Sequence, residues 1–206
     1  METQASSQLM QVLLSKEAFS VISILFTLAG FYPYVRGTLS GVVRPHVFSW
    51  VIWAITTLVV FAAQLYDGGG AGAWPIGISG VITVFIAWLA WVKRQSISIT
   101  RSDRWFFAAA VSSLPIWFVT SDPRWAVIVL TFVDVLAFWP TARKITEDPY
   151  SESMMFFVMG ATRNVFAIMA LEHYSITTAL FPAAIGSGAV LMILLMLAYR
   201  PKRSLG

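Results

Sequence analysis

The chain has 206 residues, of which 58% are hydrophobic and 12% are charged, and its mean hydropathy is +0.75. A soluble globular domain is about 45–50% apolar and about 25% charged. This composition excludes a disordered chain, and it nearly excludes a soluble enzyme, because so few charges cannot cover a water-soluble surface of this size. The class that remains is an integral membrane protein.

The sequence contains no cysteine and only two histidines. Disulfides, thiol catalysis and cysteine-ligated metals are therefore excluded, and we expect no metal site and no cofactor. No catalytic or phosphate-binding motif is found, so an intramembrane enzyme is disfavoured. The net charge of +4 does not indicate nucleic acid, because nearly all Lys and Arg lie in short gaps between apolar runs.

Long apolar runs predict membrane-spanning helices. A helix needs about 20 mainly apolar residues to cross a bilayer. Seven such runs are found, at about 18–35, 47–65, 73–92, 104–120, 124–142, 153–171 and 177–198. Asp67 and the run Gly68–Gly70 predict a turn before the third helix, and Asp122 followed by Pro123 predicts the start of the fifth.

The distribution of basic residues predicts the orientation. Eleven of the 14 Lys and Arg lie in the gaps after helices 1, 3 and 5 and in the C-terminal tail, and two lie on the other side. Cytoplasmic loops carry the excess of Lys and Arg. We therefore expect an external N-terminus and a cytoplasmic C-terminus in a plasma membrane, the inner membrane of a bacterium, which requires an odd number of spans.

The two halves of the chain share marks at an offset of 107 residues. Phe31–Pro33 and Arg36 match 138–140 and Arg143, Trp74–Pro75 match 181–182, and Lys93 matches Arg200. The chain is then a parallel repeat of two three-helix units. The expected fold is an all-α integral membrane protein with seven helices in a 3+1+3 layout. Its parts are a tail (1–17), bundle 1 (18–92), a linker helix (104–120), bundle 2 (124–198) and a cytoplasmic tail (199–206).

This layout, together with the repeated prolines, resembles the SWEET and PQ-loop transporter superfamily. The resemblance implies four prolines at the cytoplasmic ends of the first two helices of each bundle, where they act as gate or hinge residues. The matching residues are Pro33, Pro45, Pro140 and Pro149. From the residues alone, Pro45 and Pro149 also fit simple helix initiation, and Pro33 and Pro140 fit either a kink or a helix end.

Two charged residues lie near the middle of predicted helices, Asp134 in the fifth and Arg163 in the sixth. A charge in the bilayer interior is costly unless it faces a cavity or a partner. Two alternatives follow. The residues form a structural ion pair, or they line a transport path, with Asp134 binding a proton or Arg163 an anionic group of the substrate.

Further substrate-binding candidates lie on helices 2 and 6. Trp50 and Trp53 could stack on a ring of the substrate, or they belong to an interfacial aromatic belt. Asn164 is a pocket candidate because an amide in hydrocarbon needs partners. Thr57 stands at the position equivalent to Asn164 in the first half.

The sequence predicts a transporter that moves a small polar solute by alternating access, either proton-coupled or specific for an anionic substrate. The alternative is a receptor or scaffold on the same fold that binds without transport. A passive channel is a third option. The expected partners are the lipid bilayer and a small-molecule substrate, and the sequence leaves open whether the chain forms a homo-oligomer.

Overall fold

Helices make up all the regular structure in the described part of the chain, which comprises residues 11, 14–42, 45–93, 101–150 and 152–200 of a computed structural model. Within these ranges no residue lies in a β-strand. The elements are α2 (Lys16–Leu39), α3 (Val47–Tyr66), the short η1 (Gly70–Ala73), α4 (Trp74–Val92), α5 (Arg101–Thr120), α6 (Pro123–Leu136), α7 (Phe138–Glu147), α8 (Met154–Met169) and α9 (Ile176–Tyr199). Most of both predicted tails lies outside the described residues.

In the described part of the chain, five spans are long and apolar enough to cross a membrane, namely Lys16–Leu39, Val47–Tyr66, Gly70–Val92, Pro123–Glu147 and Ile176–Tyr199. α8 is apolar but shorter, and α5 has the length of a span but is less apolar. These helices are those of a multi-pass membrane protein.

Local sequence explains where these helices begin. Side chains that accept hydrogen bonds stand just before the first turns, where backbone N–H groups have no helical partner. They are Ser15 before α2, His46 before α3, Asp122 before α6, Ser153 before α8 and Ser175 before α9. The predicted start of a helix at Asp122 is confirmed.

The predicted helix 124–142 is not continuous, because α6 ends at Leu136 and α7 begins at Phe138. The reason is local. Pro140 has no N–H group, so it cannot donate to the carbonyl of Leu136. Its equivalent, Pro33, lies inside an unbroken α2. The repeated proline therefore ends a helix in one half only.

The other two prolines lie outside helices. Pro45 directly precedes His46, the N-cap of α3, which agrees with the helix-initiation alternative. Pro149 lies in the turn after α7, and α8 begins several residues later. Neither residue therefore kinks a helix.

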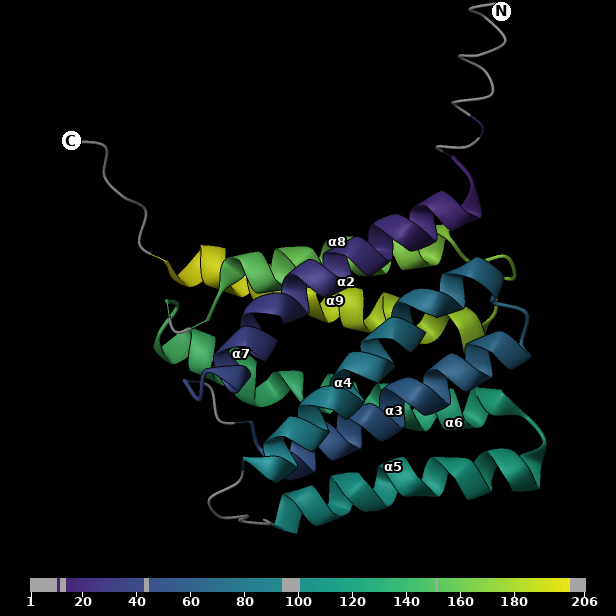
Figure 1. The fold of residues 1–206 in the computed structure, drawn as a ribbon, viewed down its shortest axis with the longest axis horizontal. Helices are drawn as coiled ribbons and strands as arrows, with labels where there is room; N and C mark the ends of the chain where they lie inside the picture. Colours follow the sequence, from purple (N-terminus) through teal and green to yellow (C-terminus); the bar gives the residue numbers. More distant parts are fainter. Residues whose placement is uncertain (1–10, 12–13, 43–44, 94–100, 151, 201–206) are drawn as a thin grey trace, which may run out of the picture.

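The first half of the chain comprises α2, α3 and α4, and the second comprises α6 with α7, α8 and α9. In each half the last of these helices packs against the others. α4 packs against α2 and α3, and α9 packs against α8 and against α6 with α7. Across the halves, α2 packs against α8 and α3 packs against α6, which pairs the first helix of each half with the second helix of the other. α5 packs on the outside, against α6 and α3 (Figure 1).

The long helices run along the length of the molecule and reverse direction at their connections, except that α7 continues from α6 toward the same end (Figure 1). Helices α2, α4 and α9 finish at one end, where α3, α5 and α8 begin. We call this the basic end, because basic residues of the described chain gather there: Arg36, Lys93, Arg101, Arg104, Arg143 and Arg200. α2, α4, α6 and α9 begin at the opposite end.

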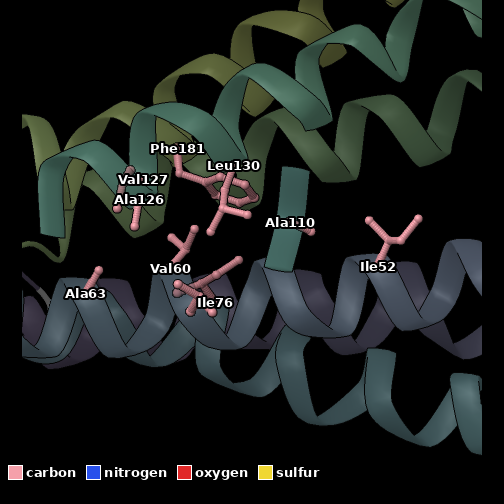
Figure 2. Close-up of a cluster of buried hydrophobic side chains, with 10 residues drawn as sticks. Ile52, Val60, Ala63, Ile76, Ala110, Ala126, Val127, Leu130 and Phe181 are labelled. Carbon is pink, nitrogen blue, oxygen red and sulfur yellow. The ribbon is translucent and has the colours of Figure 1, made fainter. Parts of the chain in front are cut away.

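A buried apolar cluster joins the halves toward the opposite end. It contains Val60 of α3, Ile76 of α4, Leu130 of α6 and Phe181 of α9, and Ala110 of α5 lies beside them (Figure 2). Close packing of these side chains excludes water from this part of the interface between the halves.

Candidate functional site

One cavity of about 340 Å³ lies between the two halves. Its lining comes from α2, α3 and α4 of the first half and from α6, α7, α8 and α9 of the second. Ile76 and Phe181 form its inner limit, and both belong to the buried apolar cluster. Glu152, from the connection between α7 and α8, also lines it. The cavity therefore runs from the middle of the molecule toward the basic end.

The lining repeats the internal symmetry of the sequence. Twelve of its 24 residues form six pairs at the 107-residue offset. The pairs are Thr27 and Asp134, Gly30 and Ala137, Phe31 and Phe138, Trp50 and Phe157, Trp53 and Gly160, and Thr57 and Asn164. Equivalent positions of both halves thus face one shared space.

Arg163 is held from three sides. Its Nη1 donates to the hydroxyl oxygens of Thr27 on α2, at 3.4 Å, and of Ser79 on α4, at 3.3 Å. The hydroxyl of Ser23 donates to the backbone carbonyl of Arg163 at 2.6 Å. These contacts fix α8 against the first half. They use Nη1 alone, and the described chain offers no hydrogen-bond partner to Nε or Nη2.

Asp134 lies one turn from the end of α6, on a different wall of the same cavity. Its Oδ1 is buried and has no hydrogen-bond partner among the described residues. No ion pair in the described structure joins Asp134 to Arg163, because α6 packs against α3, α5 and α9 whereas α8 packs against α2 and α9. Of the two alternatives from the sequence, this geometry favours charges that line a cavity over a direct ion pair.

The remaining substrate-binding candidates, Trp50, Trp53, Thr57 and Asn164, also line the cavity. Trp50 is only 6% exposed and donates through Nε1 to the hydroxyl of Tyr34 at 3.1 Å, so it packs inside the protein, which favours the substrate-binding alternative over an interfacial aromatic belt. Trp53 lies edge-on to it, with ring centroids 5.0 Å apart.

The two polar candidates differ in their partners. The Thr57 hydroxyl is within 3.1 Å of that of Thr83 and donates to the carbonyl of Trp53. Asn164 donates through Nδ2 to the carbonyl of Gly160, one turn earlier in α8, at 2.8 Å. The sequence-predicted substrate-binding residues therefore come together, whereas Pro45 and Pro149 lie apart from this space.

At the opposite end the halves are joined by hydrogen bonds. The side-chain amide of Gln64, at the end of α3, donates through Nε2 to the carbonyl of Thr178 on α9 at 2.7 Å. Gly72 lies against Leu171, and a Cβ at Gly72 would come within 2.6 Å of the backbone nitrogen of Leu171. Only a glycine permits this approach of the two backbones.

The connection between α3 and α4 also binds the connection between α8 and α9. Ser175 donates to the Asp67 carboxylate, and the Nδ1 of His173 lies 2.8 Å from the carbonyl of Asp67. The backbone N–H of Ala71 donates to Glu172 Oε1 at 2.9 Å. We call these five residues the loop latch. It lies over the end of the molecule to which the cavity does not extend.

A second space, of about 10 Å³, lies between the cavity and that end. It has room for about one water molecule. Ile76, Arg163, Asn164 and Phe181 line both spaces, and Gly72 lines the smaller one. These four shared residues therefore separate the cavity from the smaller space.

Several site residues could not be identified from composition or spacing alone. The aromatic lining residues Phe31 and Phe138 stand one helical turn after Thr27 and Asp134, so helical periodicity was the signal that could have found them. Asp67 and Gln64 carry no such signal, because their partners lie more than 100 residues away in sequence.

The fold and the site define the chain as a multi-pass, all-helical membrane protein whose packed helices surround a largely aromatic cavity that contains Asp134 and Arg163. No protein-family model, curated protein or solved structure matches the chain. Its function is therefore argued from the site alone.

Proposed function

We propose that the protein is a membrane transporter that moves a small polar solute by alternating access. The observation that carries the proposal is the cavity. It holds two charged side chains at mid-depth, it is lined by equivalent residues of both halves, and its lining includes Glu152 near the basic end and Ile76 and Phe181 of the buried apolar cluster on the other side. A solute path that is blocked at one end at a time is the requirement of alternating access.

The proposed architecture is the 3+1+3 layout of the SWEET and PQ-loop superfamily, with α5 as the linker. The packing supports it in two ways. In each half the third helix lies between the other two, and across the halves α2 pairs with α8 as α3 pairs with α6. Such reciprocal pairing is expected of two units related by an axis along the membrane normal.

The proposed orientation puts the basic end in the cytoplasm of a bacterial inner membrane, in accordance with the excess of Lys and Arg there. The described conformation is then open to the inside. The loop latch is the external gate, and its rupture would let the two halves part at the opposite end. Of the proposed hinges, Pro140 is the best supported, because α6 and α7 are separate helices that meet beside the cavity at Ala137.

Asp134 is the proposed proton-binding group. The ionised form of a carboxylate buried without a partner lies uncompensated in a medium of low dielectric constant, so either a proton or a positively charged group of the solute stabilises this site. A solute that brings a positive charge or a hydrogen-bond donor to this site compensates the ionised form. Solute and proton then compete for Asp134, which couples their movements.

Counterflow into proteoliposomes tests this proposal. Vesicles are loaded with an unlabelled mixture of amino acids, nucleosides and organic acids, and each compound is added outside as a radiolabelled tracer. A transporter accumulates at least one label transiently and saturably, and Arg163→Gln abolishes the accumulation. The exposed Arg104→Gln, which removes the same charge from α5, is the matched control.

Two results would contradict transport. Saturable binding without exchange across the bilayer would identify a receptor or scaffold on this fold. Flux that rises linearly with concentration, without saturation, would identify a channel.

A further inference from the structure

The cavity presents two opposite charges that the described protein leaves without a charged partner. Asp134 has a buried Oδ1 with no hydrogen bond, and the Arg163 guanidinium contacts only the uncharged hydroxyls of Thr27 and Ser79. Leaving either charge uncompensated in the membrane interior costs several kcal/mol. A bound solute that compensates both would remove both penalties at once.

These charges stand on separate walls. Arg163 belongs to the wall where α8 meets α2, and Asp134 to the wall where α6 meets α3 and α9. A solute between the walls meets a guanidinium on one side and a carboxylate on the other. An anion satisfies only the first and a cation only the second.

The rest of the cavity is largely aromatic. Eight of its 24 lining residues are Phe or Trp, and they include the equivalent pairs Phe31 with Phe138 and Trp50 with Phe157. Aromatic faces bind a flat unsaturated ring better than an aliphatic chain. The volume of about 340 Å³ is at the lower end of small-molecule sites, which span about 300–1,000 Å³.

We infer that the solute is a compact zwitterion that carries an aromatic ring, of which an aromatic α-amino acid is the simplest form. Its carboxylate binds Arg163 through the free Nε and Nη2 donors, its ammonium group binds Asp134, and its ring lies among the aromatic side chains toward the basic end. This inference rests on the proposed function in that it names the class of molecule that is transported. The binding of that molecule to the cavity does not itself require transport.

Binding to the full-length purified protein tests the inference without transport. Isothermal titration compares L-phenylalanine with 3-phenylpropionate, which lacks the ammonium group, with 2-phenylethylamine, which lacks the carboxylate, and with L-alanine, which lacks the ring. We expect L-phenylalanine to bind at least about tenfold more tightly than each of the other three, since each lacks one of the groups that the cavity matches.

Two variants test which residue binds the ammonium group of the ligand and which binds its carboxylate. Asp134→Asn should bind L-phenylalanine and 3-phenylpropionate equally, and Arg163→Gln should bind L-phenylalanine and 2-phenylethylamine equally. Glu147→Gln, an exposed carboxylate on α7 that pairs with Arg143, should keep the wild-type preferences. Because the ligand series on the unmodified protein is decisive by itself, a variant that fails to fold leaves the test intact.

Each outcome separates this inference from the proposed function. Equal binding of L-phenylalanine and either single-charge analogue, or no binding of L-phenylalanine, overturns the zwitterion, even if counterflow of another solute succeeds. Preferential binding of L-phenylalanine without counterflow supports the ligand class and overturns transport.

Discussion

Thr27 and Asp134 line one cavity from positions 107 residues apart, but only Thr27 has its polar group satisfied by the protein. The Thr27 hydroxyl donates to the carbonyl of Ser23 at 2.9 Å and accepts from Arg163 at 3.4 Å. The buried Oδ1 of Asp134 has no partner in the described chain. A duplicated position thus supplies a satisfied hydroxyl on one wall and an available carboxylate on the other.

Asp134→Asn should remove the pH dependence of solute binding. In the unmodified protein, acid protonates Asp134 and weakens binding, so affinity should rise as pH increases through the range in which this carboxyl group ionises. The amide of the variant does not titrate. Titration of L-phenylalanine binding over a series of pH values measures the effect, and Glu147→Gln should retain the pH dependence. An unchanged profile in Asp134→Asn would remove Asp134 from proton coupling.

Arg163→Lys should bind solute more weakly and also destabilise the fold. The ammonium keeps the charge but cannot reach both Thr27 and Ser79 while presenting a planar pair of donors to a carboxylate. Interhelical hydrogen bonds in membranes are worth about 0.6 kcal/mol on average and up to about 1.7 kcal/mol. We therefore expect a loss of about 1 kcal/mol in the free energy of unfolding in detergent. Wild-type stability in Arg163→Lys would show that the two hydrogen bonds do not tie α8 to the first half.

Lys93→Ala and Arg200→Ala should have similar effects on stability. Lys93 donates through Nζ to the carbonyls of Thr38, at 3.1 Å, and of Leu39 at the end of α2. Arg200 donates through Nε to the carbonyl of Pro149, just beyond α7, at 3.1 Å. Each cation thus binds carbonyls at or just beyond the C-terminal end of a helix of its own half, α2 for Lys93 and α7 for Arg200, where a positive charge is favourable.

Each of these two substitutions should lower the free energy of unfolding by about 1–2 kcal/mol, because hydrogen bonds to charged groups contribute about 1.5–3 kcal/mol and these sites are partly solvated. Arg104→Ala on α5 is the matched control and should change it little, since Arg104 is exposed. A large loss for one variant and none for the other would argue against equivalent roles at the 107-residue offset.

Gly77→Ala should be destabilising and Gly30→Ala should not. A Cβ at Gly77 would lie 2.7 Å from the ring of Phe61, so either this ring would have to shift or α3 and α4 would have to move apart. Overpacking of this kind costs about 1–3 kcal/mol. A Cβ at Gly30 would meet nothing within 4 Å, and alanine favours a helix interior by about 0.5–1 kcal/mol. Thermal unfolding of both variants in detergent measures the difference, and equal midpoints would show that the close packing of α3 on α4 is not required.

Much of the fold could be predicted from the sequence, because apolar length and capping residues are local properties. The run at 47–65 corresponds to Val47–Tyr66, and the run at 177–198 to Ile176–Tyr199. The break in the run at 124–142 was harder to predict from the sequence. Equivalent prolines stand in both halves, but only at Pro140 does the helix end nearby, and the packing around each helix decides between a break and an unbroken helix.

The candidate site, too, could be predicted from the sequence only in part. Asp134 and Arg163 could be identified because a charge within an apolar run is conspicuous. Their separation on two walls could not, since it depends on which helices pack together. Ser175 donates to Asp67 across a sequence separation of 108 residues, and Gly72 matters only because Leu171 lies against it. Such contacts are consequences of tertiary structure.

Single-cysteine accessibility shows whether the two halves open alternately around one cavity, and it can be applied here because the chain contains no cysteine of its own. Gly30→Cys probes the cavity, and Ala167→Cys probes the small space beneath the loop latch. Ser40→Cys and Ser121→Cys, both exposed and at opposite ends, report the orientation of the protein in the vesicles.

With a membrane-impermeant maleimide, Gly30→Cys should react from the side of the basic end. Ala167→Cys should react from the opposite side, about fivefold faster when Asp67→Asn and Ser175→Ala together remove the hydrogen bond between these two residues, because one lost hydrogen bond shifts the equilibrium by about 1 kcal/mol. Alternating access would be contradicted if Ala167→Cys did not react from that side, either with the latch intact or with the latch disrupted, in vesicles that still exchange solute.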